Sequence, residues 1–259
     1  MKTNVIAIVP SAGLGKRFNP SVRKIFAHIA GIPVFIYTLK RLQEIKSITE
    51  IIPVLREEDF RKGLKLIKSY NINKVKQIAR GGQERQDSVY NALCLIENNP
   101  PVPPFDKRGL RGDCKKGKKQ NGCLILIHDG VRPLVFAELV KRLLNEIKGV
   151  NGVIPGLPVK ETLKEINNRG YVLSTVKREK YWAIQTPQVF QYKIIKKAYD
   201  RAYKDGFYAT DDAALVERIG GKIKIIAGSP FNIKITAPED LKMAESFLNC
   251  RKSKKGVLV

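Results

Sequence analysis

The sequence predicts an α/β fold in which a mixed, mainly parallel sheet is flanked by helices. Short apolar runs alternate along the chain with amphipathic stretches, as in repeated strand–helix units. The run Cys123–His128 is almost continuously apolar, which is typical of a central parallel strand covered on both faces. Short connections between such units favour right-handed βαβ crossovers, and these crossovers build a parallel sheet.

In the N-terminal half, the apolar run Val5–Val9 predicts a buried strand that ends at Pro10. The residues that follow repeat with the periods of helices and strands in turn. Their spacing predicts helices over Val34–Ile45, Glu57–Tyr70 and Gln86–Glu97, the last opened by Asp87 and Ser88, and strands over Glu50–Leu55 and Lys74–Ala79.

The C-terminal half begins with a helix expected over Phe136–Lys148. The segment Pro158–Tyr181 then alternates like paired strands around the turn signal Asn167–Gly170, so we expect a hairpin arm that projects from the domain. The last helix is marked by Pro238 near its first position, followed by two acidic residues that suit a helix N-terminus. Between the arm and this helix we expect helices over Tyr192–Lys204 and Asp212–Ile219 and strands over Ile223–Ala227 and Asn232–Ile235.

A chain of 259 residues, 43% of them hydrophobic, can bury enough apolar surface to be stable without disulfide bonds or structural metal ions. We expect one domain over residues 1–249, with a basic, disordered surface insertion at about 100–122, and a basic tail at 250–259. Four cysteines without a CxxC spacing argue against a disulfide framework or a zinc site. The first apolar run is too short for a signal peptide or a membrane span, so we expect a cytoplasmic protein without a membrane partner.

The charge of the chain is unbalanced, with 48 Lys and Arg against 24 Asp and Glu and a net charge of +24. Such a field attracts polyanions, so nucleic acid, anionic lipid and phosphorylated small molecules are all candidate partners. The basic residues are scattered rather than arranged in a stripe, and the chain has no aromatic-rich RNA-binding motif. The favoured interpretation is a solvated basic surface without a dedicated polymer partner, and nucleic acid is the less favoured partner.

The first predicted strand leads directly into the loop Pro10–Phe18, which is built of small and basic residues. Lys16, Arg17 and, further on, Lys24 supply positive charge that suits a polyanion. The loop is neither a Walker A sequence nor a complete dinucleotide-binding motif, and a tight turn with solvated basic neighbours is the competing interpretation. Four small residues let backbone amides approach a phosphate closely: Ser11, Ala12, Gly13 and Gly15.

Two more motifs follow predicted strands. In Gly81–Ser88 the paired glycines let the backbone approach a ligand, although Asp87 and Ser88 are equally compatible with helix capping. In His128–Pro133, Asp129 ends a buried strand, and a carboxylate beside a phosphate loop suits Mg²⁺; the alternative is a hydrogen-bonded turn aspartate. Lys, Arg and one carboxylate, without a histidine acid–base pair, favour phosphoryl or nucleotidyl transfer.

Six motifs in this order resemble those of the 2-C-methyl-D-erythritol 4-phosphate cytidylyltransferase family, within the sugar-phosphate nucleotidyltransferases. The resemblance covers Asn4–Leu248 apart from Pro100–Gly122, and it implies a Rossmann-like domain with a β-arm that forms a homodimer. The motifs are Pro10–Phe18 with Lys24, Gly81–Ser88, His128–Pro133, Gln185–Gln188, Thr210–Asp211 and Asn232–Lys234.

The resemblance implies a magnesium-dependent enzyme of non-mevalonate isoprenoid biosynthesis. It implies that the cytidylyl group of CTP moves to 2-C-methyl-D-erythritol 4-phosphate, giving 4-diphosphocytidyl-2-C-methyl-D-erythritol and pyrophosphate. By motif position, Arg17 and Lys24 stabilise the transition state, while Arg178 and Lys234 orient the sugar phosphate. The implied CTP-binding residues are Ala12, Gly13, Gly15, Lys16, Gly82 and Ser88. The implied sugar-phosphate-binding residues are Asp129, Arg132, Thr162, Arg178, Thr210 and Lys234, with Asp129 also the metal ligand.

The chain departs from the family pattern at two places within these motifs. Arg23 stands before Lys24 where proline is usual, and Gly130–Val131 replaces a common Ala–Ala pair. Two other functions remain as alternatives. A ribitol-5-phosphate cytidylyltransferase would share the nucleotide motifs and differ in the sugar pocket, and a non-catalytic RNA-binding protein would account for the net charge.

Overall fold

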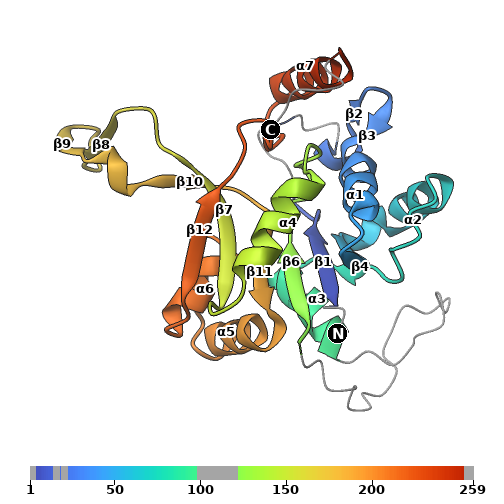
Figure 1. Cartoon of the computed structure of the whole chain (residues 1–259), viewed down its shortest axis with the longest axis horizontal. Helices are drawn as coiled ribbons and strands as arrows, with labels where there is room; N and C mark the ends of the chain where they lie inside the picture. The colour runs from blue at the N-terminus through green and yellow to red at the C-terminus, as the bar shows by residue number, and fades with distance from the viewer. Residues whose placement is uncertain (1–3, 14–17, 19–22, 98–121, 254–259) are drawn as a thin grey trace.

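A computed structural model describes residues 4–13, 18, 23–97 and 122–253, and at its centre lies a mixed sheet flanked by helices (Figure 1). Within these residues the sheet has eight strands, in the order β10-β7-β11-β6-β1-β4-β5, and β12 pairs with β7. The strands are β1 (Val5–Pro10), β4 (Ile48–Leu55), β5 (Ala79–Arg80), β6 (Leu124–Ile127), β7 (Gly152–Pro158), β10 (Trp182–Ile184), β11 (Gln188–Gln191) and β12 (Ile223–Ala227).

Strand β1 lies between β4 and β6 and runs parallel to both. β4 is also parallel to β5, and β7 is parallel to β12. Only β10 and β11 run antiparallel to their neighbours in the sheet. The sheet is therefore mixed and mainly parallel, as predicted. The carboxyl ends of β1, β4 and β6 meet at one edge, which is where open α/β sheets bind ligands.

Both faces of the sheet are buried, because side chains along each strand alternate between two hydrophobic clusters. On β1, Ala7 and Val9 belong to one cluster and Ile6 and Ile8 to the other. The first cluster is completed by α1 (Val34–Glu44), α2 (Phe60–Ser69), α4 (Ala137–Glu146) and α7 (Glu239–Ser253), and the second by α3 (Arg85–Glu97), α5 (Tyr192–Lys204) and α6 (Asp212–Arg218). Helices thus cover both faces, as continuous apolar runs such as β6 require.

The strand predicted over Lys74–Ala79 is mostly wrong. The segment does run beside β4, but it forms only an isolated bridge between Val75 and Ile51 and the two-residue strand β5. Between these contacts, three residues of the segment (76–78) face only two residues of β4 (52 and 53). The additional residue breaks the hydrogen-bond ladder, in the manner of a β-bulge.

The strand predicted over Asn232–Ile235 is also wrong, because these residues form no strand. Asn232 and Ile235 are buried and Lys234 is exposed, so burial does not alternate with the two-residue period of a strand. The two buried residues are held by loops instead. The Ile235 amide donates to the carbonyl of Val131 at 2.8 Å, and the Asn232 side chain donates to the carbonyl of Thr186 at 2.7 Å.

The sequence prediction missed β7 and β11, which occupy central positions in the sheet. β7 reads Gly-Val-Ile-Pro-Gly-Leu-Pro, and its glycines and prolines are residues that usually mark turns. β11 is only four residues long, and its first and last residues are glutamines. Neither run carries a strong strand signal, and pairing with β6 and β12 supplies what the local sequence lacks.

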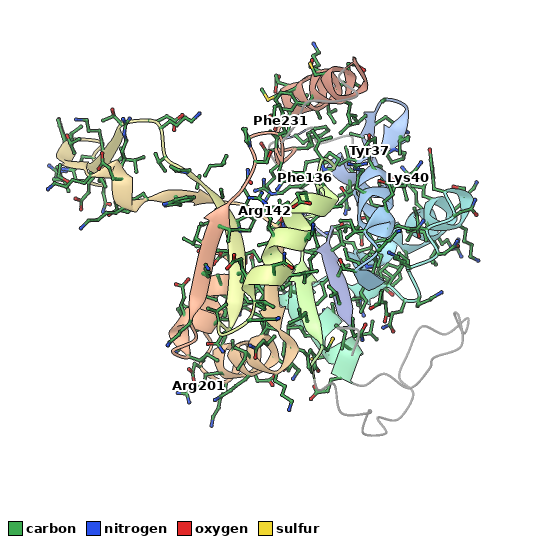
Figure 2. All side chains as sticks on the ribbon, in the orientation of Figure 1. Tyr37, Lys40, Phe136, Arg142, Arg201 and Phe231 are labelled. Carbon is green, nitrogen blue, oxygen red and sulfur yellow. The ribbon has the colours of Figure 1, made fainter. Side chains whose placement is uncertain are left out.

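The predicted hairpin arm is present. β8 (Leu163–Ile166) pairs with β9 (Val172–Val176) as a separate two-stranded sheet. Its turn is closed by Asn167, whose side-chain oxygen accepts from the amides of Arg169 and Tyr171 at 3.0 Å each. Figure 1 shows the arm extending away from the sheet beyond β7 and β10, and Figure 2 shows its side chains standing apart from those of the rest of the chain.

No helix among the described residues is long and apolar enough to span a bilayer. Cys94, Cys123 and Cys250 are free thiols. The expected insertion at 100–122 falls outside the described residues except at Gly122, and residues 254–259 of the expected tail fall outside them as well.

Candidate active site

A cavity of about 420 Å³ lies at the carboxyl edge of the sheet. It is bounded by the segments that follow β1, β4 and β6, by the loop that begins α3, and by one residue from the segment before α7. These segments place several charged groups around one space. The lining residues are Pro10, Ser11, Ala12, Gly13, Lys24, Ile25, Arg56, Gly82, Gln83, Glu84, Arg85, Ser88, Asp129, Val131 and Lys234.

The loop after β1 starts in a fixed position. The Ser11 amide donates to the carbonyl of Val54 at 2.9 Å, which extends the contact between β1 and β4 beyond Pro10. Arg56 donates from Nε to the carbonyl of Ala12 at 2.8 Å. Among the described residues, nothing lies within 4 Å of where a Cβ on Gly13 would stand. The backbone at Ala12 is therefore held in place, and open space for a ligand begins at Gly13.

The loop before α3 is tightly folded on the start of that helix. A Cβ on Gly82 would lie 2.1 Å from the Cβ of Asp87, so only glycine fits there. Asp87 accepts from the Glu84 amide at 2.8 Å, in the manner of a capping box, and Ser88 Oγ accepts from the Gly82 amide at 3.1 Å. The capping interpretation of Asp87 is thus confirmed, and the same packing places Gly82 on the cavity wall.

Asp129 is a buried carboxylate surrounded by three cationic side chains. Its Oδ2 lies 3.0 Å from Lys234 Nζ and 3.5 Å from Arg132 Nε, and its Oδ1 lies 3.4 Å from Arg85 Nε. Burial by itself raises the pKa of Asp129, but the charges of Arg85, Lys234 and Arg132 outweigh it and hold the pKa well below its usual range. Asp129 is therefore ionised at physiological pH.

Arg85 joins Asp129 to a second buried carboxylate, Asp212, which the sequence analysis missed. The guanidinium forks onto Asp212 at 2.9 and 2.6 Å, and the Tyr199 hydroxyl donates to the same carboxylate at 2.5 Å. Burial lowers the pKa of Arg85, but Asp212 and Asp129 raise it well above its ordinary value. The fork fixes the direction of the guanidinium, so that only its Nε edge faces Asp129.

His128 stands immediately before Asp129 and is completely buried. Its Nε2 lies 3.0 Å from the carbonyl of Arg132 and its Nδ1 lies 3.1 Å from the Thr186 hydroxyl, which also accepts from the Asp129 amide at 3.0 Å. Burial lowers the pKa of His128 to about 4. A neutral imidazole that donates from Nε2 and accepts at Nδ1 satisfies all three contacts. His128 thus has a hydrogen-bonding role and orients the segment that carries Asp129.

Stability is expected to depend on pH through His128. The pKa of about 4 in the folded state lies below the ordinary value of 6.5, so the unfolded chain binds more protons between these values and stability falls as the pH falls. From pH 7 to pH 5 this contribution is about 2 kcal/mol. Urea unfolding of the wild type and of His128→Gln at both pH values tests it. The variant should show a smaller loss over the same interval, and equal losses would contradict the assignment.

The structure brings together most of the residues that the resemblance implies. Seven line the cavity: Ala12, Gly13, Lys24, Gly82, Ser88, Asp129 and Lys234. Arg132 contacts Asp129 and donates to the carbonyl of Asn232 at 2.7 Å. Thr210 is exposed just before α6 and does not line the cavity. Gly15, Lys16 and Arg17 lie outside the described residues.

Thr162 and Arg178 are not brought to this cavity. Both lie in the exposed arm, where Arg178 donates to the carbonyl of Lys160. Arg56, Arg85 and Asp212 complete the charged surroundings, and none of them is among the site residues expected from the sequence. The signal available for each of the last two was its place in the sequence motifs. Arg85 stands inside the Gly81–Ser88 motif, and Asp212 stands directly after Thr210–Asp211.

Comparison with known proteins identifies the family. A family model of 2-C-methyl-D-erythritol 4-phosphate cytidylyltransferase matches residues 5–102 and 115–250, and so omits the middle of the insertion. The protein of that name from Desulforamulus reducens is 39% identical over 250 residues, covering 96% of this chain and 97% of the relative. The one from Syntrophus aciditrophicus is 38% identical over 252 residues, covering 96% and 97%.

Solved structures agree with the sequence comparison. The crystal structure of 4-diphosphocytidyl-2C-methyl-D-erythritol synthase from Anaerococcus prevotii superimposes with a TM-score of 0.75 and 29% identity, covering 96% of this chain and 97% of that one. The family match spans the loop after β1, the start of α3 and the Asp129 segment, which are the parts that build the cavity. The chain belongs to the 2-C-methyl-D-erythritol 4-phosphate cytidylyltransferase family.

Proposed function

We propose that the protein transfers the cytidylyl group of CTP to 2-C-methyl-D-erythritol 4-phosphate and releases pyrophosphate. The observation that supports this most is the cavity at the sheet edge. Lys24 and Lys234 line it together with the ionised Asp129 and with Gly13 of the loop after β1. Such a site offers cations, backbone amides and one carboxylate to a nucleoside triphosphate and a second phosphate. The described residues that line it include no nucleophile–base pair, so direct transfer between the two substrates is the chemistry that the site suits.

In this reaction a phosphate oxygen of the sugar phosphate attacks the α-phosphorus of CTP. The new P–O bond forms while the bond to the β-phosphate breaks, and pyrophosphate leaves with the electron pair of the broken bond. The role of the chain is to align the two phosphates and to meet the charge that develops between them. Lys24 supplies charge from the end of the first loop, and Lys234 supplies it beside Asp129, where a sugar phosphate would be oriented.

A magnesium ion fits this site only together with substrate phosphates. Among the described residues no group of three or more potential ligand side chains is present, and Asp129 is the buried carboxylate on the cavity wall. Mg²⁺ is commonly bound by one or two carboxylates plus phosphate oxygens and water, and the low pKa of Asp129 keeps that ligand ionised. When bound, the ion would neutralise phosphate charge. Arg85 and Arg132 would then keep the carboxylate aimed at the cavity.

The arm supports a homodimer in which each cavity receives residues from two chains. Thr162 and Arg178 stand apart from the cavity of their own chain, and the arm exposes apolar side chains at Tyr171, Val172 and Leu173, which are 69%, 59% and 61% exposed. Exposed apolar clusters of this kind are typical of interaction surfaces. An arginine on the arm of a second chain would complete the sugar-phosphate site, because its guanidinium can bind a phosphate with two parallel hydrogen bonds.

The assay that tests the proposal supplies CTP, Mg²⁺ and one sugar phosphate, and measures pyrophosphate release. We expect turnover with 2-C-methyl-D-erythritol 4-phosphate. Ribitol 5-phosphate is the matched control, because it keeps the phosphate and changes the polyol. Faster turnover with ribitol 5-phosphate would favour the alternative cytidylyltransferase, while RNA binding with a steep salt dependence and no pyrophosphate release would contradict an enzymatic function.

Replacing Asp129 with asparagine should lower the magnesium-dependent activity at limiting concentrations of the ion. The change keeps the shape of the side chain and removes its charge, so the concentration of Mg²⁺ that gives half-maximal activity should rise by about tenfold or more. A Mg²⁺ titration of pyrophosphate release measures it, with circular dichroism to confirm folding. An unchanged titration would assign Asp129 to the hydrogen-bonded turn role instead.

A further inference from the structure

The turn between β4 and α2 contacts the chain at both ends of the loop that follows β1, at Ala12 and at Arg23. It consists of Arg56 and the 3-10 turn η2 (Glu57–Asp59). Arg56 holds the start of the loop through the carbonyl of Ala12, at 2.8 Å. At the other end, the Arg23 guanidinium donates to the carboxylates of Glu58, at 3.2 Å, and Asp59. One four-residue turn therefore anchors the backbone on either side of the loop.

The contact between Arg23 and Asp59 differs from an ordinary surface ion pair. The Asp59 side chain is 9% exposed, compared with 60% for Glu58. Exposed ion pairs contribute little to stability, whereas a buried carboxylate that loses its partner is left with an uncompensated charge. Moving the Arg23 guanidinium away from Asp59 would therefore cost free energy, and the pair holds Arg23 in one position.

Two additional contacts tie the end of the loop to the same region. Glu58 Oε1 accepts from Arg23 at 3.2 Å and from Arg56 at 3.5 Å, so one carboxylate joins the arginines at the two ends. On the far side of Lys24, the Lys62 ammonium of α2 lies 4.1 Å from the centre of the Phe26 ring. The short helix η1 (Lys24–Phe26), which Lys24 begins, is therefore held at both of its ends.

We propose that Glu58 and Asp59 are positioning residues that act through Arg23 to set Lys24 in the cavity. The inference rests on the proposed cytidylyl transfer, in which the Lys24 ammonium meets charge that develops on the α-phosphate. A charge that is displaced by about 1 Å loses much of its effect on the rate, because preorganisation depends on distance. In the family pattern the position before Lys24 is usually a proline, which has no charged side chain. This chain has Arg23 there, and the ion pair of Arg23 with Asp59 holds the backbone next to Lys24.

The experiment compares Asp59→Asn and Arg23→Gln in the wild type and in a Lys24→Ala background, with pyrophosphate release measured while CTP is varied. In the wild-type background each change should lower kcat by about tenfold and change KM for CTP by less than about twofold. In the Lys24→Ala background neither change should lower kcat further, because both act through Lys24. Arg23→Lys, which keeps the charge, should recover part of the kcat that Arg23→Gln loses.

The matched control is Glu57→Gln, in the same turn. Glu57 pairs with Arg80 at 2.6 Å through side chains that are 69% and 65% exposed, and it contacts neither end of the loop, so kcat should not change. Arg23 is 27% exposed, so Arg23→Gln carries the test if Asp59→Asn folds poorly. An unchanged kcat in the wild-type background, or an equal loss in both backgrounds, would overturn the inference. Absence of turnover in the wild type would overturn the proposed function itself, and this inference with it.

Discussion

Replacing Lys24 with alanine is expected to lower kcat by about 10²–10³-fold while KM for CTP changes by less than about threefold. Lys24 begins η1 and lines the cavity together with Gly82 and Asp129. In the proposed reaction its charge is most useful when negative charge accumulates around the α-phosphate. An interaction made mainly in the transition state affects kcat rather than the binding of the ground state.

The measurement is steady-state pyrophosphate release with CTP varied at saturating sugar phosphate and Mg²⁺. Lys40→Ala is a suitable control, because Lys40 lies on α1 (Figure 2), near the ring of Tyr70 at 5.8 Å, and does not line the cavity. It should retain the kcat of the wild type. If Lys24→Ala raised KM for CTP and left kcat unchanged, Lys24 would be a residue that binds the triphosphate, and its proposed role in the transition state would be wrong.

The second large effect is the recovery of activity in mixed dimers. At a limiting concentration of Mg²⁺, Asp129→Asn chains and Arg178→Ala chains should each have little activity alone. If the arm of one chain serves the cavity of its partner, a mixed dimer contains one site with both defects and one site with neither. Random exchange of equal amounts makes about half of the dimers mixed, so about a quarter of the wild-type activity should return.

Mixing two differently tagged Asp129→Asn preparations is the control, and it should restore nothing. Exchange of subunits must be verified by recovery of dimers that carry both tags. If the arm serves its own chain, every site in a mixed dimer keeps one defect, and verified mixed dimers without recovered activity would reject the shared site. The arrangement of the arm, with Arg178 bound to the carbonyl of Lys160 and away from the cavity, is the reason to expect recovery.

Much of the fold can be predicted from the sequence by itself, because a strand or helix that packs on the core needs apolar residues at regular intervals along the chain. Val5–Val9 and Cys123–His128 are continuous apolar runs because both faces of β1 and β6 are covered, and they form strands as predicted. The motifs that carry Gly13 and Asp129 each follow one of these strands. Since β1 and β6 are parallel neighbours, their carboxyl ends meet, and two motifs far apart in the chain share one cavity.

Only the tertiary structure decided the features that depend on partners distant in sequence. β7 contains two prolines and two glycines and becomes a strand because β11, β10 and β12 pair with it, while the predicted strand Asn232–Ile235 lacks a partner strand and forms a loop. The fork of Arg85 on Asp212 joins residues 127 positions apart. No local period marks such a contact, because the attraction between the two charges offsets their desolvation only when they are close together, and only the folded chain brings them within reach.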